Sequence, residues 1–167
     1  MLPITVLSDR PQTELLYRIA RALDGMTGGF ILREQTSRSP VFLERGVLVM
    51  RDVRKARRLA LGEGVVAVLE PNCHAALKMA AERSMRPVCC GMSARDTLTA
   101  ESISDGRALV CLQRAIPTVS GTDREPCQLV AITDGDCSAS ALLLTVGVLL
   151  AAGDERSEIK MDGYCQK

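Results

Sequence analysis

The fold is decided by Gly64-Val-Val-Ala-Val-Leu69, which is followed by Glu70-Pro71-Asn72 and, later, by Pro87-Val-Cys-Cys90. A continuous run of β-branched and aliphatic residues predicts a strand that is buried on both faces, as in a parallel sheet. The segment from Glu70 to about Ser84 predicts a helix, which supplies the crossover that two parallel strands need. This strand–helix–strand order predicts an α/β fold.

Towards the N-terminus, short apolar runs alternate with helical periods in the same way. The run Ile4-Thr-Val-Leu7 predicts a strand, and Ser8-Asp9 after it is a turn or helix-capping signal. From Pro11 to Leu23 apolar residues recur at helical spacing, and Asp24-Gly25 ends the helix. Three further strands are predicted at residues 30–32, 41–43 and 46–50.

The segment Arg51–Leu61 predicts a basic amphipathic helix. Val53, Ala56 and Ala60 fall on one face of such a helix, and the charged residues fall on the other face. A solvated surface is the simpler interpretation of these charges. The outward-facing charged residues are Arg51, Arg54, Lys55 and Arg58.

After Gly91 the pattern changes to that of a small antiparallel sheet. Asp105-Gly106 is a strong hairpin-turn signal between two apolar runs. The predicted strands are Thr97–Ile103, Arg107–Gln113 and Cys127–Ile132.

A final apolar helix is predicted from Ser138 to about Ala152. We therefore expect a single domain over residues 1–153. Its predicted fold is a three-layer α/β arrangement, with a mostly parallel sheet flanked by helices and a small antiparallel β meander. Residues 154–167 are expected to form a polar, frayed tail.

Composition excludes several classes of function. The 167 residues include no Trp, two Tyr and two Phe, which are too few rings for a stacking platform that binds single-stranded nucleic acid. A formal net charge of +1 gives no overall attraction to nucleic acid or to a membrane surface. The apolar runs are too short to span a bilayer, and the N-terminus lacks a signal-peptide pattern. A cytoplasmic location is therefore expected.

The seven cysteines follow no disulfide framework and contain no C-x-x-C pair. Buried, reduced thiols of a cytosolic protein are the simplest interpretation. The vicinal pair Cys89-Cys90 leaves redox sensing or soft-metal binding open, provided that the thiols lie in an exposed, electropositive setting.

Several short sequence motifs occur along the chain in an order that is known from one protein family. Ala67-Val-Leu-Glu-Pro-Asn-Cys73 is followed by Val88–Ser93, Asp96 and Ala100–Ile103, and Asp134–Leu143 lies at the start of the last helix. With these residues the chain resembles the central, ATP-binding domain of the Mur ligase family, which includes folylpolyglutamate and cyanophycin synthetases. The resemblance covers most of the chain, although the matching residues are of types that are common in proteins. It implies that the predicted α/β fold is of the Mur ligase central-domain type.

The resemblance also implies candidate site positions near the N-terminus. Ile4-Thr5 and the helix Thr13–Leu23 look like the family's phosphate-binding strand, loop and helix. The loop here reads Ser8-Asp9-Arg10-Pro11, so it lacks the glycines that cradle phosphates and the hydroxyl that binds Mg²⁺. The positions carried over for cofactor binding are Ser8, Asp9, Arg10 and Thr13, together with Lys55, which resembles the family's carbamylated lysine. No catalytic residue and no metal ligand is assigned.

Two further features have functional and structural interpretations. His74, the only histidine, begins a helix at the carboxyl edge of the sheet, where it could act as a base or contact an anion. Asp134-Gly-Asp136 with Glu125 could bind a cation. A surface-polar histidine and a capped turn explain the same residues more simply.

Two functions remain open on this basis. The first is a non-catalytic Mur ligase-like domain that needs no cofactor. It would act as a homo-oligomer, with a partner protein, or by binding a small ligand. The second is a residual ATP-dependent carboxylate–amine ligase subunit of the cell-wall or polyglutamate type, which would use Mg-ATP and partner domains. The altered phosphate loop favours the first function.

Overall fold

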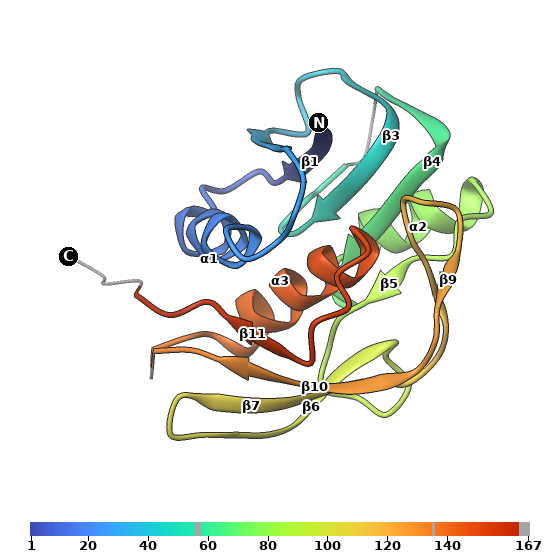
Figure 1. The fold of residues 1–167 in the computed structure, drawn as a ribbon. Coiled ribbons are helices and arrows are strands. Elements are labelled where there is room, and N and C mark those ends of the chain that lie inside the picture. Colours follow the sequence, from blue (N-terminus) through green and yellow to red (C-terminus); the bar gives the residue numbers. More distant parts are fainter. Residues whose placement is uncertain (56–57, 135, 164–167) are drawn as a thin grey trace.

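The computed structural model describes residues 1–55, 58–134 and 136–163, and its centre is a sheet of five parallel strands (Figure 1). The predicted α/β class is therefore confirmed. Pairing is parallel throughout this sheet. In spatial order the strands are β2 (Phe30–Gln35), β1 (Leu2–Leu7), β3 (Val41–Met50), β4 (Leu59–Leu69) and β5 (Val88–Cys89).

The antiparallel meander predicted after Gly91 forms a second sheet. In this sheet β6, β7 and β10 pair antiparallel, and β11 adds to β10 in parallel. Asp105 and Gly106 have φ angles of 50° and 72°, as a tight hairpin turn requires. The strands are β6 (Leu98–Ser104), β7 (Arg107–Leu112), β10 (Cys127–Ile132) and β11 (Glu158–Lys160), with a separate pair β8 (Ile116–Pro117) and β9 (Asp123–Arg124).

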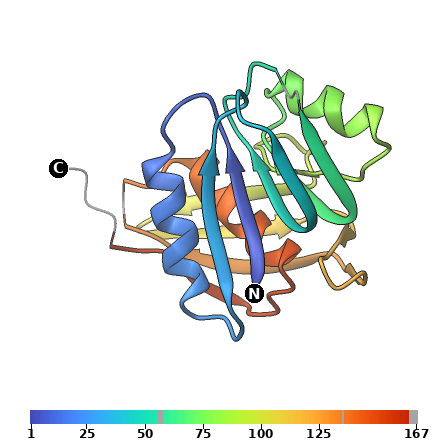
Figure 2. The ribbon, with the colours of Figure 1, turned by 90° about the horizontal axis from the view of Figure 1, so that it is seen from above.

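Two helices lie between the sheets. α1 (Thr13–Leu23) and α3 (Ala139–Ala151) pack side by side there, and α2 (His74–Glu82) covers the opposite face of the parallel sheet (Figures 1 and 2). The antiparallel strands thus form a layer of their own. In the described residues, the parallel sheet has helices on both of its faces, as predicted, and the antiparallel strands add a further layer.

α3 is the centre of the core because it is apolar on every side. All residues from Ala141 to Ala151 are buried, as expected of a helix with apolar layers above and below it. Gly147 lets α3 approach the parallel sheet closely. A Cβ atom at this position would lie 2.8 Å from Cys90 Sγ and 2.9 Å from Val68 Cγ1.

The helix predicted over Arg51–Leu61 is wrong. Residues 51–55 form an irregular connection, and Leu59–Leu61 belong to β4, where they pair with Val41–Leu43 of β3. Leu59 is buried and Ala60 is exposed, so the burial alternates as in a strand. Ala56 lies outside the described residues.

The C-terminal segment also differs from the expected frayed tail. Glu158–Lys160 form β11, and Ile159 and Met161 are fully buried. Asp154 is buried as well, and its two carboxylate oxygens accept hydrogen bonds from the Nε atom of Arg156. Isolated apolar residues in a polar stretch give no periodic signal, so the sequence pattern does not predict this strand.

Candidate functional site

The carboxyl ends of β1, β2 and β3 lie at one edge of the parallel sheet, where three loops meet. Ligands of open α/β sheets bind at this edge, because the loops there diverge around a crevice. We refer to the first two loops as the β1 loop (residues 8–12) and the β2 loop (residues 36–40). The third is the β3 loop, whose described residues are 51–55 and 58.

Asp9 of the β1 loop ties the other two loops together. Its Oδ1 atom accepts hydrogen bonds from Ser37 N at 3.1 Å and from Ser37 Oγ at 2.5 Å. Its Oδ2 atom accepts from Arg54 N at 2.9 Å. Burial alone would raise the pKa of Asp9, but the hydrogen bonds from Arg54 and Ser37 lower it below the ordinary value. The carboxylate is therefore ionised and committed to the protein's own backbone.

Gln12 is a second tie between the β1 loop and the β3 loop. This buried side chain donates from Nε2 to Ser8 Oγ and to Asp52 Oδ2, both at 3.0 Å. Asp52 has a φ angle of 53°, in the left-handed region that few residues other than glycine adopt. The β3 loop is thus fixed at two places, by Asp9 and by Gln12, in a backbone shape that its sequence alone would not prefer.

Between the β2 loop and the β3 loop lies an open hollow of about 1010 Å³, which we call the basic hollow. Its charged side chains other than Asp9 are all cationic and exposed. Within the described part of the chain, none of these cations takes part in an ion pair. The lining residues are Asp9, Thr36, Ser37, Arg38, Arg54, Lys55 and Arg58.

The predicted phosphate-loop residues do not form a phosphate cradle. Ser8 is buried, and its Oγ atom accepts from Arg10 N at 3.1 Å, while Arg10 itself is exposed. Thr13 is exposed at the first residue of α1. At this helix start, Gln12 N donates to the Glu34 carboxylate at 2.8 Å. A carboxylate of the protein therefore takes an amide that phosphate-binding loops offer to their ligand.

Lys55 lies in the β3 loop and not on a helix, and it lines the basic hollow together with Asp9. Two of the predicted positions thus come together. Sequence reasoning missed Ser37 and Arg38, although the polar segment Thr36–Pro40 after a strand is a recognisable loop signal.

The vicinal cysteines lie in a setting unsuited to thiolate chemistry. Cys90 is fully buried, and burial raises its pKa well above the ordinary value. Burial also raises the pKa of the half-buried Cys89 thiol. Reactive cysteines need the opposite shift, so the structure gives no support to redox sensing at this pair.

In the acidic turn near residue 134, Asp134 is half-buried and pairs with a buried arginine, while Asp136 is exposed. Asp134 lies 2.8 Å from the Nη2 atom of Arg18, and residue 135 lies outside the described residues. Across residues 1–55, 58–134 and 136–163, no group of three or more His, Cys, Asp or Glu side chains is placed to hold a metal ion.

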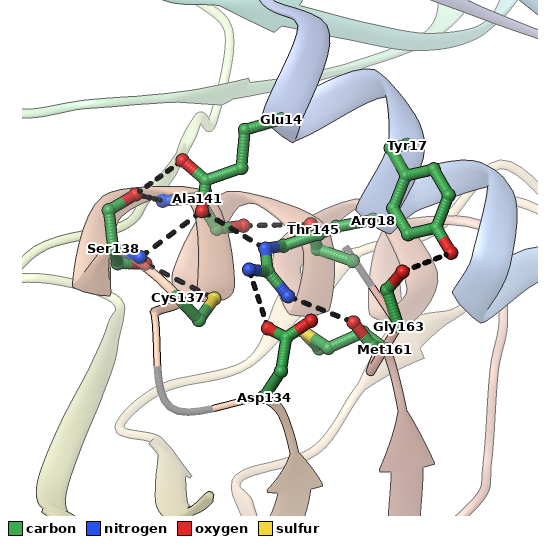
Figure 3. A network of polar contacts seen from close by, with 10 residues as sticks. All are labelled: Glu14, Tyr17, Arg18, Asp134, Cys137, Ser138, Ala141, Thr145, Met161 and Gly163. Atoms are coloured by element: carbon green, nitrogen blue, oxygen red, sulfur yellow. Dashed lines mark hydrogen bonds and ion pairs between the residues drawn. The ribbon is translucent and has the colours of Figure 1, made fainter. Parts of the chain in front are cut away.

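Arg18 is the centre of the polar network that Figure 3 shows. Its side chain is fully buried and contacts Glu14 Oε1 at 3.0 Å, Asp134 at 2.8 Å and the Met161 carbonyl at 3.0 Å. Glu14 also accepts from Ser138 N at 3.2 Å. The network therefore joins α1, the start of α3 and the C-terminal segment, and we assign it a structural role.

His74 is exposed at the start of α2, where it lines a hollow that does not include the predicted phosphate-loop residues. It lies beside Lys55 and Arg54, so the structure brings the only histidine next to the basic hollow. This agrees with the placement of His74 at the carboxyl edge of the sheet.

No protein-family model and no curated protein matches this chain. The resemblance to the Mur ligase family therefore stays a prediction. In the described part of the chain, no helix is both long enough and apolar enough to cross a membrane.

Proposed function

We propose that this chain is a small-ligand-binding domain that holds a multivalent anion in the basic hollow without converting it. The observation that carries the proposal is the set of exposed cations around one hollow. Arg38, Arg54, Lys55 and Arg58 have no ion-pair partner among the described residues. Among the described lining residues Asp9 is the only acid; it is engaged by three hydrogen bonds and also attracts Arg54.

The side-chain chemistry favours phosphate or carboxylate groups. A guanidinium presents paired donors that match two oxygens of either group, and the hollow offers three of them. The ties made by Asp9 and Gln12 hold the loops in place before a ligand arrives. Preorganisation of this kind reduces the entropy lost on binding and so favours affinity.

The ligase alternative has weaker support at the β1 loop. Glu34 and Asp9 put two carboxylates beside the start of α1, where the phosphates of a nucleotide would need to lie. Like charges would repel there. Binding of ATP that requires Mg²⁺ remains the distinguishing property of this alternative.

Calorimetric titration with pyrophosphate at low salt tests the proposal. The wild type should bind it, and Arg54→Ala/Arg58→Ala should weaken binding about tenfold, as expected for two exposed charge contacts. Arg107→Ala, an exposed cation on β7, is the matched control and should bind normally. Absence of binding to the wild type, or equal binding by the double variant, contradicts the proposal. Mg²⁺-dependent ATP binding in a parallel titration would support the ligase instead.

Self-association is a second candidate function, favoured by exposed apolar side chains near the edge of the parallel sheet. Phe42 is 78% exposed and Met1 is 88% exposed, and both line a shallow hollow with Ile31. β2 is also an edge strand with an unpaired side. Light scattering should give a dimer for the wild type and a monomer for Phe42→Ser. A wild-type monomer at high concentration contradicts this candidate.

A further inference from the structure

A second hollow of about 460 Å³ adjoins the basic hollow and shares two of its residues. Arg54 and Lys55 line both hollows, so they form a ridge between them. Beyond the ridge, the second hollow is lined by one face of α2. The α2 residues are His74, Ala75, Lys78, Met79 and Glu82.

The α2 face that lines the second hollow is polar where it is exposed, because Met79 is buried. His74 and Lys78 are exposed and four residues apart, so they lie on neighbouring turns of the helix. Lys78 lies 3.8 Å from Glu82 in an exposed pair, which is too loose and too well solvated to neutralise it fully. The second hollow can therefore receive an anionic group beside Lys78.

From this continuity we infer that the ligand of the basic hollow is an elongated molecule with two anionic groups joined by a short linker. This inference rests on the proposed function. One anionic group binds among Arg38, Arg54 and Arg58. The linker crosses the ridge formed by Arg54 and Lys55, and the other anionic group reaches Lys78 and His74. A second charged contact made through a linker adds affinity without a second association step.

The test compares alkanediol bisphosphates with alkyl monophosphates of the same chain length, by calorimetric titration of the full chain. The bisphosphate of suitable length should bind about tenfold more tightly than its monophosphate. Lys78→Ala should weaken bisphosphate binding about fivefold and leave monophosphate binding unchanged. Glu82→Gln removes the competing carboxylate and should strengthen bisphosphate binding alone. Dicarboxylates of the same lengths distinguish a phosphate ligand from a carboxylate ligand.

The outcomes separate the two proposals. If neither probe binds, or if Arg58→Ala leaves both affinities unchanged, the proposed function fails. If monophosphate binds and depends on Arg58, but bisphosphates gain nothing or Lys78→Ala has no effect on them, only the second hollow is excluded. Unfolding midpoints of Lys78→Ala and Glu82→Gln should match the wild type, because both side chains are exposed.

Discussion

Replacement of Arg18 by Leu should destabilise the protein more than any other change in its polar network. The guanidinium is fully buried between Glu14 and Asp134, and it also donates to the Met161 carbonyl. Leu fills much of the same volume but removes the cation that faces both carboxylates and the donor of the Met161 carbonyl, while Glu14 keeps its hydrogen bonds from Ser138. The variant therefore isolates the loss of a cation from the loss of packing.

The magnitude follows from the burial of the two carboxylates. Removing one partner of a buried ion pair costs about 3–5 kcal/mol. The Glu14 and Asp134 side chains keep 20% and 26% of their exposure, so water can partly solvate them. We therefore expect the lower end, about 3 kcal/mol. For a chain of this length, that loss lowers the melting temperature by about 6–12 °C.

Urea denaturation followed by far-ultraviolet circular dichroism measures the effect, since the chain has no Trp for fluorescence. A companion variant, Arg18→Leu with Glu14→Gln and Asp134→Asn, removes the stranded charges and should recover at least half of the loss. A loss below about 1 kcal/mol for Arg18→Leu would refute the assignment of the network as a structural centre. So would a companion variant no more stable than Arg18→Leu itself.

Three further predictions concern single sites. Gly147→Ala should lower the free energy of unfolding measured in urea. Overpacking against Cys90 costs about 1–3 kcal/mol, which outweighs a gain in helix propensity of about 1 kcal/mol. A more stable variant would contradict the close approach of α3. Burial raises the pKa of Glu70, so stability from this group is greatest at low pH and is lost as pH rises through that raised pKa. Glu70→Gln should flatten this part of the stability profile, and an unchanged profile would exclude Glu70 as its source. The lowered pKa of Asp9 gives the opposite sign, with stability lost as pH falls through that lowered pKa. Asp9→Asn should remove that acid-side loss, and an unchanged acid-side profile would exclude Asp9 as its source.

Continuous apolar runs were sufficient to predict most of the fold. Two segments, residues 64–69 and the helix after Ser138, are apolar on every side. Neither has a polar face to turn towards water, so their burial follows from their composition. The helix predicted over Arg51–Leu61 was wrong because the apolar residues of this segment fit a helical period, while its last three residues also fit the alternating burial of a strand. Pairing of Leu59–Leu61 with β3 decided between these patterns, and such pairing depends on residues far away in sequence.

The candidate site was predictable in place but not in composition. The carboxyl edge of a parallel sheet is where a ligand is expected, and Asp9 and Lys55 were already candidates. Ser37 and Arg38 belong to another loop, which the pairing of β2 with β1 and the hydrogen bonds of Asp9 bring to the hollow. Hydrogen bonds between distant loops leave no periodic pattern in a sequence.

The position of α3 has a consequence for the order in which the chain folds. Together with α1 this helix fills the space between the two sheets, yet it is formed by residues 139–151, near the end of the described chain. During synthesis from the N-terminus, the apolar inner faces of the strands made before residue 139 are covered by α1 alone. A nascent chain that ends before residue 139 therefore cannot complete its core. We expect folding to be late, slow and dependent on protection from aggregation until α3 has emerged.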